Sequence, residues 1–113
     1  MDLLDVDTRE LDGWTVVVVR GQLDVATAPR VRQVLVEAQY GGHADVVIDL
    51  AGVEFLDSMG LGVLVGALKR ARSHDAELVL AGANDRIRHV LELSGVAQVT
   101  RMVDRVEDVV PSD

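Results

Sequence analysis

Residues 46–66, VVIDLAGVEFLDSMGLGVLVG, decide the fold because they contain a buried strand, the start of a helix and a serine where the two meet. Val46 to Leu50 is an apolar run with one aspartate, which is typical of a strand covered on both faces of its sheet. Gly52 is expected to be the turn residue of a loop. Apolar residues then recur every three or four positions between Leu61 and Ala71, which indicates an amphipathic helix over about 58–73.

Ser58 falls at the start of that helix. Its hydroxyl can accept a hydrogen bond from a free backbone N–H of the first turn, and Gly60 and Gly62 leave space around it. Position alone favours a helix cap, which is a common structural role for serine. A cap, however, requires neither Asp57 before the serine nor the glycines after it. The whole segment therefore points to a site that a partner approaches closely.

The elements on either side alternate between strand and helix. The expected strands are Leu3–Arg9, Trp14–Arg20, Asp45–Leu50, Glu77–Ala81 and Val96–Thr100, with an Asp12-Gly13 turn between the first two. The expected helices begin at Thr27, at Ser58 and at Asn84 or Asp85, and they end at Gly41-Gly42, Ser73 and Gly95. A final amphipathic turn runs through Val110. This alternation predicts an α/β domain with a mixed sheet and helices packed on it.

Two segments resemble signatures of one known family, the anti-sigma factor antagonists within the sulfate transporter and anti-sigma antagonist (STAS) domain family. Asp57-Ser58-Met59-Gly60-Leu61-Gly62 is similar to the family's phosphorylation-site segment. Gly21-Gln22-Leu23-Asp24-Val25-Ala26-Thr27-Ala28 is similar to its second signature, after the preceding strand. The two segments stand in the family's order and spacing, and the likeness covers about Thr15 to Val103. Met59 differs at a position where the family is often small or polar.

The resemblance implies both a fold and a set of functional residues. The fold is a single STAS-like domain over residues 1–113, with a mostly parallel sheet of four to five strands and helices packed largely on one side. Ser58 is implied to accept phosphate from a cognate kinase, and Asp24 to help position it. Spacing alone gives Asp24 an equal chance of being a turn or cap acceptor and favours a capping role for Thr27. The residues expected to contact a partner are Asp24, Thr27, Asp57, Ser58, Met59, Gly60, Gly62 and Val63.

Met59, Val63 and Ala67 form a second, mildly apolar stripe on the helix that follows Ser58. Half-buried packing is the default explanation for this stripe. Because it begins beside Ser58, part of it is also expected to pack against a protein partner. On that hypothesis, Val63→Glu blocks partner binding without unfolding the domain.

Composition excludes several classes of function. The 113 residues fit one domain and carry 11 Lys and Arg against 19 Asp and Glu, so a net charge of −8 disfavours binding to nucleic acid or anionic lipid. Without cysteine there is no disulfide, thiolate metal site or cysteine nucleophile. The acidic start MDLLDVDTRE does not resemble a signal peptide, and no apolar run approaches the length of a membrane span. A cytoplasmic location is expected.

The residues that usually carry catalysis or hold a cofactor show no suitable pattern. His43, His74 and His89 lack metal-ligand spacing, and no pair of carboxylates is placed by the sequence as acid and base. The glycines at 60, 62 and 66 are not followed by the Lys-Ser/Thr of a phosphate-binding loop. The sequence therefore predicts no enzyme, metal or cofactor.

Three functions stay open at this point. The resemblance implies an anti-sigma factor antagonist: unphosphorylated, it binds an anti-sigma factor serine kinase and frees a sigma factor. On this hypothesis, phosphorylation of Ser58 dissociates the complex, and a serine phosphatase returns the protein to its binding-competent form. The second hypothesis is a STAS subunit of another assembly, such as a stress-signalling complex or a lipid-transport apparatus. The third is a small enzyme or nucleotide-binding protein. A single acidic domain suggests a monomer when free.

Overall fold

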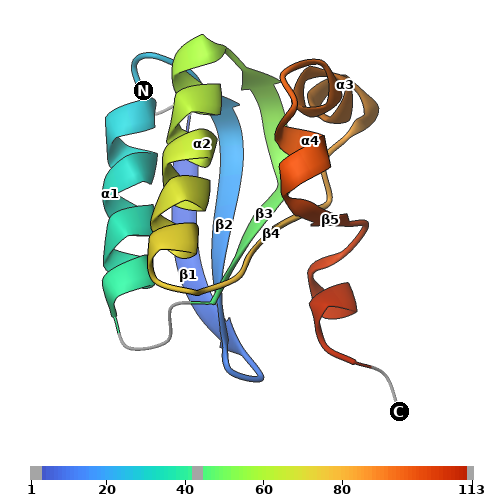
Figure 1. Cartoon of the computed structure of the whole chain (residues 1–113). Coiled ribbons are helices and arrows are strands. Elements are labelled where there is room, and N and C mark those ends of the chain that lie inside the picture. The colour runs from blue at the N-terminus through green and yellow to red at the C-terminus, as the bar shows by residue number, and fades with distance from the viewer. Residues whose placement is uncertain (1–3, 42–44, 112–113) are drawn as a thin grey trace.

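The computed structural model describes residues 4–41 and 45–111, and it shows one five-stranded sheet in the order β1-β2-β3-β4-β5 (Figure 1). The strands are β1 (Leu4–Leu11), β2 (Trp14–Leu23), β3 (Val46–Leu56), β4 (Leu78–Ala81) and β5 (Arg101–Val103). β1 is antiparallel to β2, whereas the other neighbouring strands are parallel. The predicted mixed, mostly parallel sheet is confirmed. The Asp12-Gly13 turn joins β1 to β2 with both residues at positive φ, as a tight hairpin requires.

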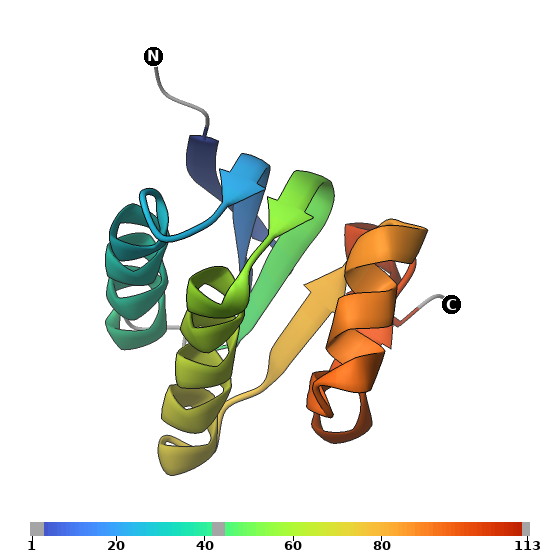
Figure 2. The same cartoon turned by 90° about the horizontal axis from the view of Figure 1, so that it is seen from above.

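The main helices lie on one face of the sheet. They are α1 (Ala28–Tyr40), α2 (Ser58–Ser73), α3 (Asp85–Leu93) and the short α4 (Val96–Val99). Figure 2 shows α1, α2 and α3 side by side over that face. A 3₁₀ turn, η1 (Val106–Val109), belongs to the C-terminal segment and packs against the other face. The expectation that helices cover largely one side is confirmed.

Alternate residues of the central strands enter two separate apolar clusters. Val17 on β2 and Ile48 on β3 pack toward the helices, while their neighbours Val16 and Val47 pack with Val106 on the opposite face. All five side chains are buried. Burial on both faces explains why the sequence reads as a nearly continuous apolar run here and shows little strand alternation.

The predicted loop at Gly52 is wrong, because β3 continues without a break to Leu56. The pairing of β3 with β2 shifts in register between Val18 and Arg20, and again at Gly21. Gly52 lies opposite Arg20, and a Cβ there would approach the Arg20 Cγ atom to 2.8 Å. This glycine therefore permits a close, irregular strand pairing, which sequence inspection mistook for a turn.

The predicted strand at Val96–Thr100 is also wrong, because this segment forms α4 and β5 begins only at Arg101. Gly95 has a φ of 88°, a left-handed conformation that turns the chain directly into the new helix. A short apolar run does not distinguish strand from helix by periodicity, so the error follows from the length of the segment. The first expected strand begins at Leu3 and the second helix-ending glycine is Gly42, and both residues lie outside the described part of the chain.

Candidate functional site

The two segments that carry the family signatures meet at the carboxyl ends of β2 and β3 (Figure 2). Because these strands are parallel, Leu23 at the end of β2 pairs with Leu56 at the end of β3. The Asp57 backbone N–H also donates a hydrogen bond to the Leu23 carbonyl oxygen over 3.2 Å. Asp24 and Ser58 therefore follow strand ends at the same edge of the sheet.

Asp57, and not Ser58, caps α2. Its Oδ1 accepts a hydrogen bond from the Gly60 N–H at 2.9 Å, and its Oδ2 accepts one from the Val25 N–H at 3.0 Å. Ser58 is the first residue of the helix and is exposed. Aspartate is as good a cap as serine, so Asp57 has the capping role that position alone favoured for Ser58. The Ser58 hydroxyl is thus left accessible to solvent.

Asp24 and Thr27 shape the loop between β2 and α1. Asp24 Oδ1 accepts hydrogen bonds from the Ala26 and Thr27 N–H groups at 3.0 and 3.1 Å, which is the turn-acceptor role considered for it. Thr27 occupies the N-cap position of α1 but makes no side-chain capping bond. Its hydroxyl instead donates to the Gln22 carbonyl oxygen at 2.6 Å and accepts from the Asp24 N–H at 3.0 Å. Both residues therefore have a structural role in holding the loop.

The two glycines after Ser58 differ in their surroundings. Gly60 is buried against the end of β2, where a Cβ would collide with the Leu23 carbonyl oxygen. Gly62 is exposed, and a Cβ there would meet nothing within 4 Å. Gly60 is thus needed for the close approach of α2 to β2, whereas Gly62 has no such structural requirement.

The second apolar stripe of α2 is mostly part of the core. Met59 is 54% exposed, but Val63 is only 9% exposed and Ala67 is fully buried. The expectation of half-buried packing along the whole stripe is therefore wrong, because α2 turns this side toward α1 as well as toward the sheet. Val63→Glu would place a charge among buried apolar groups, so it cannot separate a binding defect from unfolding.

Sequence reasoning missed one residue at this edge. Val25 is 64% exposed at the tip of the β2–α1 loop, and its N–H is held by Asp57 beside Ser58. The sequence feature that could have identified Val25 is its apolar side chain between the polar residues Asp24 and Thr27. Val25 and Met59 together place exposed apolar side chains on the two segments that flank the serine.

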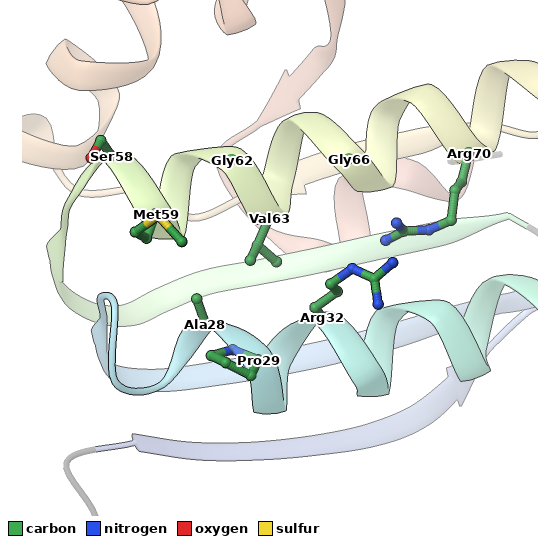
Figure 3. A pocket seen from close by; sticks show the side chains of 9 residues that line it. All are labelled: Ala28, Pro29, Arg32, Ser58, Met59, Gly62, Val63, Gly66 and Arg70. Atoms are coloured by element: carbon green, nitrogen blue, oxygen red, sulfur yellow. The ribbon is translucent and has the colours of Figure 1, made fainter.

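A groove of about 320 Å³ lies between α1 and α2, with Ser58 at one end and Arg70 at the other (Figure 3). We call it the α1–α2 groove. It is lined by Ala28, Pro29, Arg32, Ser58, Met59, Gly62, Val63, Gly66 and Arg70. Four of the residues expected to contact a partner, Ser58, Met59, Gly62 and Val63, thus share one surface feature.

The described residues contain no group of three histidine, cysteine, aspartate or glutamate side chains that could hold a metal ion. His74 and His89 are exposed, and His43 lies outside the described part of the chain. The His74 ring contacts the Tyr40 ring edge to face, at a centroid distance of 4.8 Å. Among the same residues, no helix has the length and apolar character needed to cross a membrane.

Comparison with known proteins places this architecture in a family. The STAS domain model matches residues 5–109, and the chain belongs to the STAS domain family. The anti-sigma-B factor antagonist of Staphylococcus aureus is 35% identical over 104 residues, which are 92% of this chain and 96% of that protein. This family membership supports a non-catalytic domain, in agreement with the expectation that the chain is not an enzyme.

Solved structures agree with this assignment. An anti-sigma factor antagonist from Mycobacterium paratuberculosis superposes with a TM-score of 0.85 and 26% identity, over 93% of this chain and 89% of that one. The Bacillus cell fate determinant SpoIIAA in its phosphorylated form gives a TM-score of 0.73 over 93% of this chain and 95% of its own. At 20% identity, the SpoIIAA match supports the fold alone.

Gly60→Ala is expected to destabilise the domain by about 1–3 kcal/mol, because the new methyl group must displace the end of β2 or the start of α2. Gly62→Ala is the matched control on the same helix turn. It is expected to leave stability unchanged or raise it by up to about 1 kcal/mol, since alanine favours a helix more than glycine does. Urea denaturation of both variants measures the difference, and equal midpoints would contradict the proposed packing constraint.

Proposed function

We propose that this protein is an anti-sigma factor antagonist controlled by phosphorylation of Ser58. The unphosphorylated form binds an anti-sigma factor serine kinase and so frees a sigma factor. Phosphorylation of Ser58 by that kinase then dissociates the complex. A serine phosphatase resets the switch. In this proposal residues 1–113 act as one cytoplasmic STAS domain, monomeric when free, without a cofactor of its own.

The observation that carries the proposal is an exposed serine at the first position of α2, in a chain that is 35% identical to an anti-sigma-B factor antagonist. SpoIIAA, which has the same fold, has been solved in both unphosphorylated and phosphorylated forms. A helix N-terminus is also a favourable place for a phosphate, because the positive end of the helix dipole lies there. A phosphate on Ser58 would therefore lie at a favourable end of α2.

The charges around Ser58 explain how phosphate would weaken a complex. A phosphoserine adds about −1.5 to −2 charge at neutral pH. Asp57 is the next residue and Asp24 lies on the loop held beside it, so the added charge meets two carboxylates. A partner fitted against the neutral hydroxyl would have to bury this charge or exclude it. Weakening binding a hundred- to a thousandfold requires roughly 3–4 kcal/mol, which one buried unpaired charge can supply.

The partner face is proposed to include Asp24, Val25, Ser58 and Met59. Val25 and Met59 are more than half exposed although both are apolar, and an interface of this kind needs apolar contact around its polar centre. Two further residues hold this face in place: Gly60 packs closely against Leu23, and Thr27 hydrogen-bonds to the Gln22 carbonyl oxygen. Val63 lines the adjoining α1–α2 groove and is proposed to add apolar contact there.

Ser58 modification is tested directly by intact mass and peptide mapping of the protein from its native cells, in growth and under stress. A phosphoryl group on Ser58 in only one condition, absent from Ser58→Ala, is the expected result. Unmodified Ser58 in every condition would contradict the switch and would favour a STAS subunit of another assembly.

Phosphorylation of Ser58 is expected to shift the Tm by less than about 4 °C, which corresponds to less than about 1 kcal/mol for a domain of this size. The reason is that Ser58 is exposed and makes no hydrogen bond with the described residues that the phosphate would break. Thermal melts of stoichiometrically phosphorylated and unmodified protein measure this. A much larger drop would mean that the modification acts by unfolding the domain and not at the interface.

Met59→Glu is expected to weaken binding to the anti-sigma factor kinase at least about tenfold, because it places a charge in the proposed apolar contact beside Ser58. Leu93→Glu is the matched control, since Leu93 is 76% exposed on α3 and outside this face. Isothermal titration with the purified kinase compares the two variants. Equal affinities in two folded proteins would remove Met59 from the interface.

A further inference from the structure

The α1–α2 groove has an apolar half and a cationic half. The apolar half is formed by Ala28 and Pro29 on α1 and by Met59, Gly62, Val63 and Gly66 on α2. The cationic half is formed by Arg32 and Arg70. Its volume of about 320 Å³ lies at the lower end of the range for small-molecule sites, which also have mostly apolar walls and a few polar groups.

The two arginines approach one another from opposite walls. Figure 3 shows Arg32 reaching up from α1 and Arg70 reaching down from α2 toward the same space. Arg70 is fixed in place, because its Nε donates to Gln39 Oε1 at 2.8 Å, while Gln39 Nε2 donates to the Ala67 carbonyl oxygen at 2.7 Å. Gln39 is itself 4% exposed. The guanidinium group of Arg70 is therefore fixed by hydrogen bonds and does not move freely in solvent.

The Nη2 atom of Arg70 is buried and has no hydrogen-bond partner. Guanidinium N–H groups are strong donors, and leaving one buried without an acceptor costs free energy. Arg32, although exposed, brings a second positive charge to the same end of the groove. A negatively charged acceptor placed at this end of the groove would be attracted by both cations.

The chain itself supplies no such acceptor in the part that the structure describes. No ion pair there joins Arg32 or Arg70 to a carboxylate, although the sequence has a net charge of −8. Burial lowers the pKa of Arg70, Arg32 lowers it further, and Tyr40 acts in the opposite sense. Two like charges thus face each other, and no carboxylate among the described residues forms an ion pair with either.

We propose that the α1–α2 groove binds a short aliphatic monocarboxylate. The carboxylate accepts charge-assisted hydrogen bonds from the guanidinium groups of Arg32 and Arg70, which line the same end of the groove. The aliphatic chain lies along Val63 and Pro29 toward Met59. From Met59 to Gly66 the helix rises by about 10 Å, which is room for an alkyl chain of moderate length. The proposal does not depend on the Ser58 switch.

The test is a titration of the ¹⁵N-labelled full-length protein with sodium octanoate, followed by amide chemical shifts. Saturable shifts centred on Met59, Val63, Gly66 and Arg70 are expected. Octylammonium, with the opposite head-group charge, and acetate, which lacks the chain, are both expected to bind at least about tenfold more weakly. Raising the ionic strength should weaken octanoate binding, because Arg32 is exposed to screening.

Arg32→Gln is the decisive variant, since Arg32 is exposed and its replacement should leave the fold intact, as a thermal melt can verify. It is expected to weaken octanoate binding at least about tenfold, as for the loss of one charge-assisted hydrogen bond. Arg86→Gln on α3 makes the same charge change away from the groove and should have no effect. The proposal is overturned if octanoate gives no saturable shifts, if octylammonium binds equally well, or if the two variants behave alike.

Discussion

The carboxylate of Asp57 joins the two segments that flank Ser58. One of its oxygens accepts from the Gly60 N–H and fixes the start of α2, while the other accepts from the Val25 N–H and fixes the β2–α1 loop. The same residue's N–H bonds to the Leu23 carbonyl oxygen at the end of β2. Two segments that lie more than 30 residues apart are thus joined through one side chain and its backbone. Ser58 follows immediately, so its place relative to the loop is set by this bridge.

Close packing makes the bridge possible. The start of α2 lies against the Leu23 carbonyl oxygen, at a distance that only Gly60 allows. The parallel pairing of β2 with β3 brings this carbonyl to the start of the helix in the first place. A rigid edge of this kind is consistent with the proposed switch, in which a charge added to Ser58 acts on the surface and not on the packing beneath it.

α2 serves three environments at once. Leu64 and Ala67 lie in the core against the sheet, Ser58 and Met59 reach the surface, and Val63 lines the groove shared with α1. The division follows from the helix lying in a layer with a neighbour on one side and the sheet below. Farther along, the Gln39 bridge to Ala67 and Arg70 joins α1 to α2 through polar contacts. The two helices therefore form one surface that runs from Ser58 to the arginine pair.

The sequence by itself determined the mixed sheet, the three longer helices and the place of Ser58 at a helix start, because apolar periodicity and glycine positions reflect local geometry and burial. It also offered the turn acceptor as one of two roles for Asp24, and this role needs only near neighbours. It could not show that Gly52 sits inside a strand, that Val96 begins a helix, or that Val63 is buried, since each depends on packing between distant segments. Likewise only the tertiary structure decided that Asp57 bonds to Val25 and that Arg70 faces Arg32. Such contacts join residues far apart in the chain, and no local pattern records which of them the fold brings together.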